Sequence, residues 1–215
     1  MNFIPEEIKR WHEGLSHKAK LLYYGVLGNL SLTALDVAAS IMGGHGSAIN
    51  GLHNAGDIAA YGLRGLATSE DIEQTTSRCL LFGANLLALS LTGWLTARSG
   101  LELLENSRHT LEPGAAYLET ASSLGNFVIA AGLKEQDSDP EGCAHTQDDH
   151  ALSDGHHHAK TDAWAGLFGA TGLALAVTTG DSRLDSLGAL AGGTYFLLHM
   201  LQHMRNKNSN VHHHH

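Results

Sequence analysis

The sequence has little of several residue types, and each shortage narrows the class of protein. Its 215 residues include two cysteines, Cys79 and Cys143, so no disulfide framework is expected. It has only three prolines, together with 25 glycines and 43% hydrophobic residues, a composition compatible with packed helices. The length fits a single domain.

Basic stripes and several catalytic or nucleotide-binding motifs are also missing. The formal net charge is −9, and no basic stripe marks a surface for nucleic acid. No GxxxxGK[ST] loop occurs, which argues against ATP-driven transport by this chain, and no HExxH motif indicates a zinc protease. The first apolar run follows twenty residues of mixed charge without a small-residue cleavage site, so no cleavable signal peptide is predicted.

Charge is absent from two long stretches. Residues 79–97 ("CLLFGANLLALSLTGWLTA") and 163–180 are long enough to cross a hydrocarbon core of about 30 Å. Neither has the polar face of a surface helix, and their small residues suit helix packing in lipid. Four weaker apolar segments carry one or two polar groups each: residues 21–42, 46–63, 114–133 and 184–204. We therefore expect an all-α, polytopic membrane protein with six transmembrane helices; a soluble helical bundle is the alternative.

The basic residues are distributed unevenly between the two sides of such a six-helix domain. With a cytoplasmic N-terminus, ten lysines and arginines fall on the cytoplasmic side and three on the other. The ten are Lys9, Arg10, Lys18, Lys20, Arg64, Arg78, Lys134, Lys160, Arg205 and Lys207, and the three are Arg98, Arg108 and Arg183. The positive-inside rule favours this orientation, with both termini in the cytoplasm.

Two segments flank the predicted transmembrane domain, residues 21–204. In residues 1–20, apolar side chains recur at helical spacing among charges, which predicts an amphipathic helix at the membrane interface or an ordinary solvated helix. These apolar residues are Ile4, Ile8, Trp11 and Leu15. Residues 205–215 form a short tail, and we interpret its final histidines, residues 212–215, as the remnant of a purification tag.

Two of the predicted helices carry a histidine and an aspartate four residues apart. His53 and Asp57 stand in "HNAGD", and His158 and Asp162 stand in "HAKTD" about a hundred residues later. Positions i and i+4 project from one helix face, one turn apart, so each pair can reach a single ion. An isolated carboxylate inside a membrane costs several kcal/mol, and two such pairs facing each other would supply the missing partners.

The chemistry of these four ligands suggests a transported ion. Two imidazole nitrogens and two carboxylate oxygens suit tetrahedral Zn²⁺, whereas Mg²⁺ and Mn²⁺ prefer oxygen ligands. Ligand type alone does not exclude Cd²⁺ or Co²⁺. Histidine has a reference pKa of about 6.5, so two protonated histidines could neutralise the carboxylates after the metal leaves. The residues thus predict antiport of one zinc ion against up to two protons by alternating access.

These motifs resemble those of the cation diffusion facilitator family of zinc transporters. The paired HxxxD motifs, in the second and fifth predicted spans, carry the resemblance. Supporting features are Asn29, "INGLHNAGD", "SSLGNFVIAAG" with Asn126, and "RLDSLGALAGG" with Asp185. The resemblance covers residues 21–204 and implies six transmembrane helices, a homodimer, and zinc efflux or sequestration driven by protons. It also implies a zinc-preferring transport site, made of His53, Asp57, His158 and Asp162.

The sequence also departs from the pattern of this family. Members commonly carry a cytoplasmic metal-binding domain after the sixth span, whereas only about ten residues follow here before the tag. The chain therefore resembles the members that lack this domain, and dimerisation is expected through the membrane helices. Asn50 stands three positions before His53, where the family often has an acidic residue.

Further metal ligands lie outside the HxxxD motifs. Residues 134–157 are rich in Asp, Gly and His, and are interpreted as a disordered cytoplasmic loop. Its ligands could capture zinc and pass it to His158, or they could be incidental residues of a solvated linker. They are Cys143, His145, His150, His156 and His157. His199 and His203 repeat the four-residue spacing in the last span and could form a weak accessory metal site or remain solvated.

Three further acidic residues lie within or beside the predicted helices. Asp185 is expected to cap the sixth helix, since an acid in a first turn is favoured by the helix dipole. Asp36 could line the cavity that leads to the site. Glu119 has no partner that the sequence identifies.

Two other functions would use the same four ligands. A membrane zinc-binding or sensing protein would hold the ion without moving it. An intramembrane metalloenzyme would need an open coordination position and a nearby general base, which the sequence does not indicate. We predict a transporter rather than an enzyme, with metal ions, protons and lipid as partners, in a bacterial inner membrane.

Overall fold

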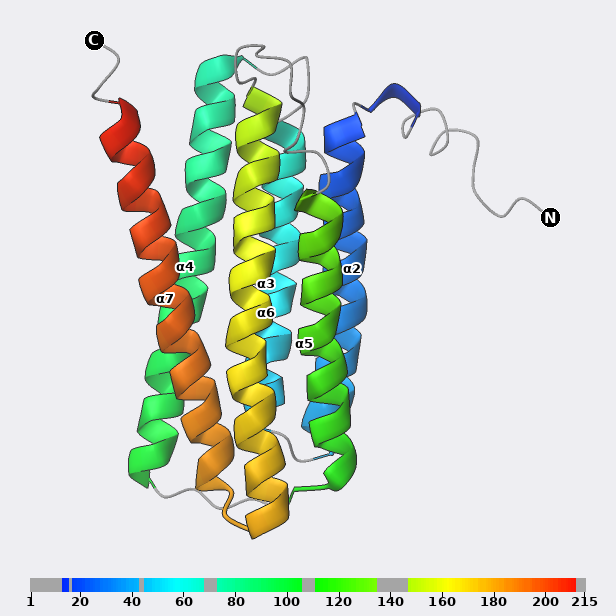
Figure 1. Cartoon of the computed structure of the whole chain (residues 1–215), viewed down its shortest axis with the longest axis vertical. Coiled ribbons are helices and arrows are strands. Elements are labelled where there is room, and N and C mark those ends of the chain that lie inside the picture. Colours follow the sequence, from blue (N-terminus) through cyan, green and yellow to red (C-terminus); the bar gives the residue numbers. More distant parts are fainter. Residues whose placement is uncertain are drawn as a thin grey trace, which may run out of the picture.

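The computed structural model describes residues 13–15, 17–42, 45–67, 73–105, 111–134 and 147–211. Within these ranges the chain forms six long α-helices and no β-strand, so the all-α prediction is confirmed for them (Figure 1). The helices are α2 (His17–Ile41), α3 (His45–Ala67), α4 (Gln74–Glu105), α5 (Pro113–Lys134), α6 (Gln147–Thr179) and α7 (Arg183–Val211).

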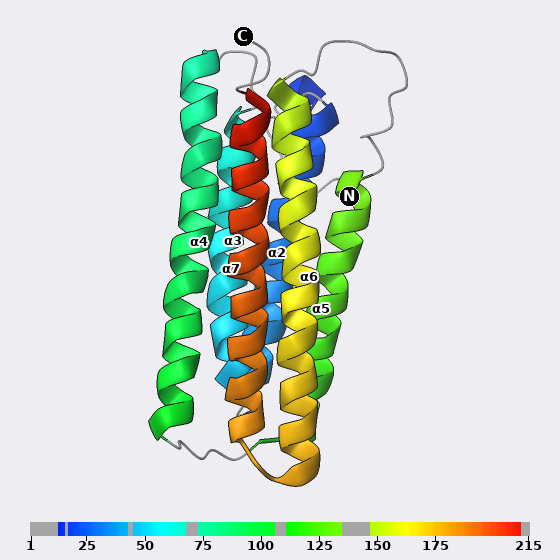
Figure 2. The same ribbon diagram turned by 60° about the vertical axis from the view of Figure 1, so that its left-hand side comes forward.

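The six helices form one antiparallel bundle. Successive helices run in opposite directions, so the beginning of α2 and the end of α7 lie at the same end of the bundle, as Figure 1 and Figure 2 show. Helix α3 packs against α2, α4, α6 and α7, and helix α6 packs against α2, α3, α5 and α7. These two central helices are the ones that carry "HNAGD" and "HAKTD".

Helix α6 begins earlier than the sequence predicts. The prediction of a loop through residue 157 is wrong for residues 147–157, because they form the first turns of this helix. Packing stabilises these turns, since Ala151 and Leu152 are buried in one cluster with Leu22 and Tyr61. The rest of the predicted loop, residues 135–146, lies outside the described residues.

The predicted N-terminal helix and tail are described only in part. Of the apolar residues in the predicted amphipathic helix, Ile4, Ile8 and Trp11 lie outside the described residues. At the other terminus, α7 continues through Val211, so most of the predicted tail is helical.

Two helices are long and apolar enough to cross a membrane. These candidate spans are Ala19–Ile41, within α2, and Thr75–Glu105, within α4. Helix α6 is not one of the two, although it contains most of the charge-free stretch of residues 163–180. The structure therefore identifies two candidate membrane spans, and the six-span topology stays a prediction.

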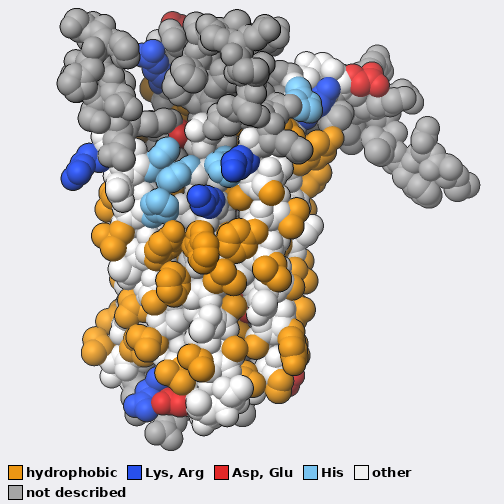
Figure 3. Space-filling view, viewed as in Figure 1, with side chains coloured by type: hydrophobic (Ala, Val, Ile, Leu, Met, Phe, Trp, Pro, Cys, Tyr) orange, Lys and Arg blue, Asp and Glu red, His pale blue; other side chains and the backbone are white. Residues whose placement is uncertain are grey.

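The bundle has charged residues in its interior and large apolar residues on its surface. Asp36, Arg64, His158 and Asp185 are each 0% exposed. In contrast, every helix exposes large apolar side chains, which form much of the surface in Figure 3. Examples, one from each helix, are Leu27, Leu66, Phe82, Val128, Trp164 and Leu198. An apolar surface this extensive is typical of contact with lipid or another protein rather than with water alone.

Glycines allow α6 and α7 to approach closely. A Cβ atom on Gly188 would lie 2.6 Å from the carbonyl oxygen of Phe168 and 2.8 Å from the Cα atom of Gly172. A Cβ atom on Gly192 would meet the carbonyl oxygen of Ala165. These are backbone contacts, so side-chain rotation cannot relieve them. Small residues therefore set the spacing between the two helices.

We expect the Gly188→Ala variant to be less stable than the native protein, although alanine is the better helix former. The added methyl group must push α6 and α7 apart, and overpacking of this kind typically costs about 1–3 kcal/mol. The measurement is the apparent melting temperature in detergent. Gly132→Ala is the matched control, because a Cβ atom there meets nothing within 4 Å. An unchanged or raised melting temperature for Gly188→Ala would contradict the proposed tight contact.

Candidate metal centre

The two HxxxD pairs face each other across the centre of the bundle. His53 and Asp57 lie one turn apart on α3, and His158 and Asp162 lie one turn apart on α6. Each of the four side chains offers one ligand atom, and these atoms all lie within 4.8 Å of one another. Among the described residues, no other group of three or more His, Cys, Asp or Glu side chains converges in this way.

The shortest contacts in this group run between the helices. His53 Nε2 lies 2.9 Å from Asp162 Oδ1, and His158 Nε2 lies 2.7 Å from Asp57 Oδ1. The distances within each helix are longer, 3.6 Å from His53 Nε2 to Asp57 Oδ2 and 3.3 Å from His158 Nε2 to Asp162 Oδ2. The four side chains therefore form a closed ring, in which each imidazole lies between two carboxylates.

Water has little access to this ring. The side chains of Asp57, His158 and Asp162 are at most 1% exposed, and that of His53 is 13% exposed. Buried carboxylates need nearby positive charge, because their desolvation is costly. Two protonated imidazoles or one divalent cation would each balance the two carboxylates. The ring can thus hold either two protons or one metal ion at the same net charge.

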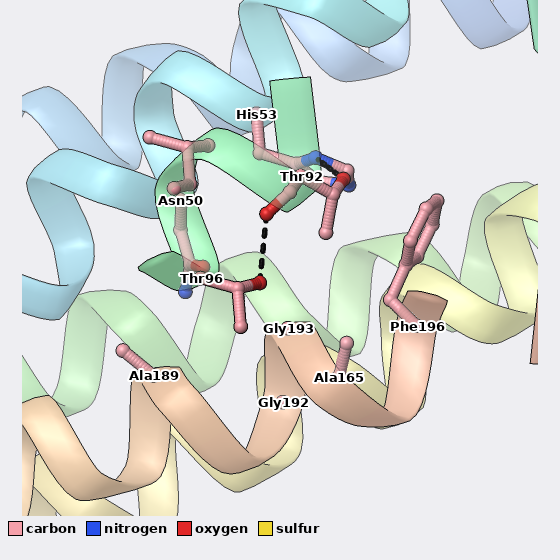
Figure 4. Close-up of a pocket in the computed structure, with 10 residues that line it drawn as sticks. Asn50, His53, Thr92, Thr96, Ala165, Ala189, Gly192, Gly193 and Phe196 are labelled. Atoms are coloured by element: carbon pink, nitrogen blue, oxygen red, sulfur yellow. Dashed lines mark hydrogen bonds between the residues drawn. The ribbon is translucent and has the colours of Figure 1, made fainter. Parts of the chain in front are cut away.

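The two histidines differ in the surroundings of their other ring nitrogen. His53 Nδ1 lies 3.0 Å from Thr92 Oγ1 on α4 (Figure 4). Because a hydroxyl group both donates and accepts, Thr92 can donate to Nδ1 while His53 Nε2–H donates to Asp162. It can instead accept from Nδ1–H when Nε2 binds a metal. In contrast, His158 Nδ1 is buried and has no hydrogen-bond partner among the described residues.

Two small hollows meet at His53. The first lies between α3, α4, α6 and α7, and Figure 4 shows Thr92 and Thr96 on one side of it and Gly192 and Gly193 on another. The second lies between α3, α5 and α6, and most of its lining residues are of polar types: they include Asn50, Asn54, Ser122, Ser123, Asn126 and Asp162. The first hollow extends toward the end of the bundle where α3 and α7 begin, since its lining includes residues one or two turns nearer to that end.

Asp36 supports the second hollow without lining it. Its Oδ2 atom accepts hydrogen bonds from Asn54 Nδ2 at 2.6 Å and from Ser122 Oγ at 3.0 Å. Both donors line the hollow, whereas Asp36 is fully buried behind them. The expectation that Asp36 lines the cavity is thus replaced by an indirect role, in which it fixes two of the lining residues. Asn54 follows His53 directly, so Asp36 also restrains α3 beside the ring.

The structure also places the other two acidic residues considered in the sequence, Glu119 and Asp185. Glu119, for which the sequence gives no partner, accepts a hydrogen bond through Oε1 from Asn50 Nδ2. Asp185 lies in the first turn of α7, as expected for an acid near a helix N-terminus. Asp181 also contributes at this helix end, since its Oδ1 atom accepts a hydrogen bond from Arg183 N at 3.2 Å.

The two predicted zinc-capture residues whose side chains are described, His156 and His157, do not lie together. Three of the five lie where no side chain is described: Cys143, His145 and His150. His156 Nδ1 lies 2.7 Å from the carbonyl oxygen of Ala130 on α5. His157 instead lies against α7, beside His199 and His203. Adjacent residues on one helix face different neighbours, so His156 and His157 cannot act as one site.

Some residues around the site could not have been identified from the sequence. Thr92 lies in the charge-free run of residues 79–97, where nothing distinguishes it from the other small polar residues.

Comparison of the chain with protein-family models, curated proteins and solved structures gives no match. The function is therefore inferred from the residues of the ring and their geometry.

Proposed function

We propose that this chain is a membrane transporter that exports zinc, or a similar divalent transition-metal ion such as Cd²⁺ or Co²⁺, from the cytoplasm in exchange for protons. The observation that carries this proposal is the ring of His53, Asp57, His158 and Asp162 between α3 and α6. Its two nitrogen and two oxygen ligands suit zinc. Because each helix supplies half of the ligands, a relative movement of α3 and α6 would take the site apart.

Charge balance supports the exchange of metal for protons. A net charge inside a membrane is costly, so a transport site is easier to reorient when it stays neutral. One Zn²⁺ ion neutralises the two carboxylates, and two protons on the histidines neutralise them equally well. Thr92 fits both states of His53, since Nδ1 carries a proton in the imidazolium form and in the metal-bound form, and the hydroxyl oxygen can accept from Nδ1–H in each. An exchange of one zinc ion for two protons therefore keeps the ring neutral throughout.

The positions of basic residues at the two ends of the bundle support a particular orientation of the protein in the membrane. Lys20, Lys134 and Arg205 lie toward the end where α2 begins and α7 ends, whereas Arg183 begins α7 at the opposite end. By the positive-inside rule, the first of these ends is cytoplasmic. We include in the proposal the six-span topology, transport of the cation diffusion facilitator type, a homodimer and a bacterial inner membrane.

In this orientation the site is closed toward the cytoplasm. Tyr61 Oη donates to the carbonyl oxygen of Gly155 at 2.9 Å, and Arg64 Nη2 donates to Asn85 Oδ1 at 2.8 Å. Both Tyr61 and Arg64 are fully buried, and they lie one and two turns beyond Asp57 on α3. The hollow beside His53 extends in the other direction. This conformation fits the stage of an alternating-access cycle in which metal has been shut off from the cytoplasm.

Flux measurements test the proposal. The protein is reconstituted into vesicles with a pH-sensitive dye and a zinc-sensitive dye inside, and zinc is added outside with and without a pH gradient. We expect zinc uptake coupled to proton release, faster when the zinc-loaded side is less acidic than the receiving side. Zinc binding without any flux would overturn transport and favour a sensor. Zinc-dependent hydrolysis of a peptide or ester would favour a metalloenzyme.

A further inference from the structure

A second group of metal-ligand side chains lies between α6 and α7. It consists of Asp154 and His157 on α6 and His199 and His203 on α7. The rings of His157 and His203 stack with their centroids 3.9 Å apart and an interplanar angle of 18°, and the ring of His199 lies 4.8 Å from that of His157. His203 Nε2 lies 3.1 Å from Asp154 Oδ1. Figure 3 shows histidines gathered on one face of the molecule, between the apolar surface and the end of the bundle.

The hydrogen bonds within this group leave ligand capacity unused. His157 Nε2 is buried and has no hydrogen-bond partner among the described residues. The unprotonated nitrogen of a neutral imidazole carries a lone pair that can bind a metal. A simple helix-packing contact would more often use apolar residues at these positions. The group instead offers three nitrogen ligands and one carboxylate.

We propose that Asp154, His157, His199 and His203 form a second zinc site, which loads the ring of His53, Asp57, His158 and Asp162 from the cytoplasm. The loading role rests on the transport function proposed above. Three imidazoles and one carboxylate make a four-ligand set for Zn²⁺, and imidazole favours zinc and its neighbours over Mg²⁺ or Ca²⁺. The position also fits, because His157 directly precedes His158 of the ring, on the side that the proposed orientation places toward the cytoplasm.

Metal binding requires the second site to rearrange. In the present conformation its ring nitrogens do not converge, since the rings of His157 and His203 are stacked. His203 has a side chain that is 20% exposed, and His199 is also partly exposed, so both can rotate without unpacking the core. Asp154 is already placed beside His203 and is 3% exposed. The carboxylate would then orient an imidazole and serve as the fourth ligand.

Zinc titration against a competing indicator dye tests this site directly. Four proteins are compared, all with residues 212–215 replaced by alanine: the native sequence, Asp57→Asn with Asp162→Asn, His199→Gln with His203→Gln, and His156→Gln. We expect each double variant to bind one zinc ion fewer than the native sequence. Asp57→Asn with Asp162→Asn should lose the ion of the ring, and His199→Gln with His203→Gln should lose the ion of the second site. His156→Gln is the matched control and should retain native binding, because His156 bonds the backbone of α5 instead.

Vesicle flux tests the loading role. For His199→Gln with His203→Gln we expect an apparent KM for zinc that is raised severalfold, with the maximal rate retained, because zinc must then reach the ring without prior binding at the second site. Native zinc stoichiometry in this variant, or an unchanged KM, would overturn the proposal. If the His199→Gln with His203→Gln variant still binds the one zinc ion of the ring, the variant is folded. If the native protein shows no zinc flux, the transport function fails, while the zinc stoichiometries still decide whether the second site exists. If Asp57→Asn with Asp162→Asn keeps full stoichiometry and flux, the ring is not the transport site.

Discussion

The Asp162→Asn variant is expected to transport no zinc above the leak of protein-free vesicles, while remaining folded. Asp162 supplies one of the two negative charges of the ring, and its Oδ1 and Oδ2 atoms contact both His53 and His158. Asparagine keeps the shape and can still form a hydrogen bond, but it cannot neutralise a divalent cation. Loss of outer-shell partners alone typically costs about 10–100-fold in metal affinity, so loss of an anionic ligand should exceed that range.

The experiment needs a control for charge and one for folding. Asp181→Asn makes the same chemical change in the exposed turn before α7, where Asp181 pairs with Arg183. Its flux should equal that of the native protein. Elution of Asp162→Asn as a single native-like peak in detergent would show that the bundle is intact. Zinc flux in Asp162→Asn within about twofold of native would contradict the assignment of the ring as the transport site, given the loss expected for a ligand.

Zinc affinity is expected to fall steeply as the pH falls through the range in which imidazole gains its proton. Metal and proton compete for the same nitrogens, His53 Nε2 and His158 Nε2. Each proton displaced by zinc contributes about tenfold in apparent affinity per pH unit, so two protons give about a hundredfold. The sign follows from the competition: acid favours the protonated, metal-free ring, and alkali favours the zinc-bound ring. Dye-competition titrations at a series of pH values measure this slope.

Single histidine variants sharpen this prediction. His53→Gln and His158→Gln should each bind zinc more weakly and each reduce the slope by about one proton per zinc. A control is His17→Gln, since His17 lies at the exposed start of α2, away from the ring. A native slope in both ring variants would mean that the protons bind elsewhere, and a flat profile in the native protein would exclude proton exchange at the ring.

Helix periodicity and charge distribution predicted much of the fold. The charge-free run at residues 79–97 lies within α4, and the ranges predicted for the other five helices overlap those observed. The predicted beginning of α6 was wrong, because the polar composition of residues 134–157 indicated a solvated loop. Residues such as Asp154 and His156 suggest a solvated segment, but Ala151 and Leu152 pack against Leu22 and Tyr61 from distant parts of the chain. Such long-range burial leaves no local signal.

The four ring residues were predictable because their spacing places each pair on one helix face. The pairing between helices was not, since a motif such as "HNAGD" does not show whether His53 bonds its own Asp57 or Asp162 on the other helix. The sequence also does not show that Thr92 contacts His53 or that Asp36 contacts Asn54 and Ser122. Thr92 acts through the ring nitrogen that faces away from Asp162, and Asp36 acts through Asn54 and Ser122. Both roles depend on the packing of neighbouring helices.

The pairing between helices also affects how the protein is made. Asp57 and its shortest partner, His158, are 101 residues apart, so at a synthesis rate of about 5–20 residues per second the partner is made roughly 5–20 s later. Throughout that interval α3 holds a carboxylate whose nearby ring partner is His53, 3.6 Å away on the same helix. The i,i+4 spacing would then give the carboxylate a temporary partner during insertion into a membrane. The spacing that we propose for metal binding in the finished protein would thus also stabilise the nascent chain until α6 is made.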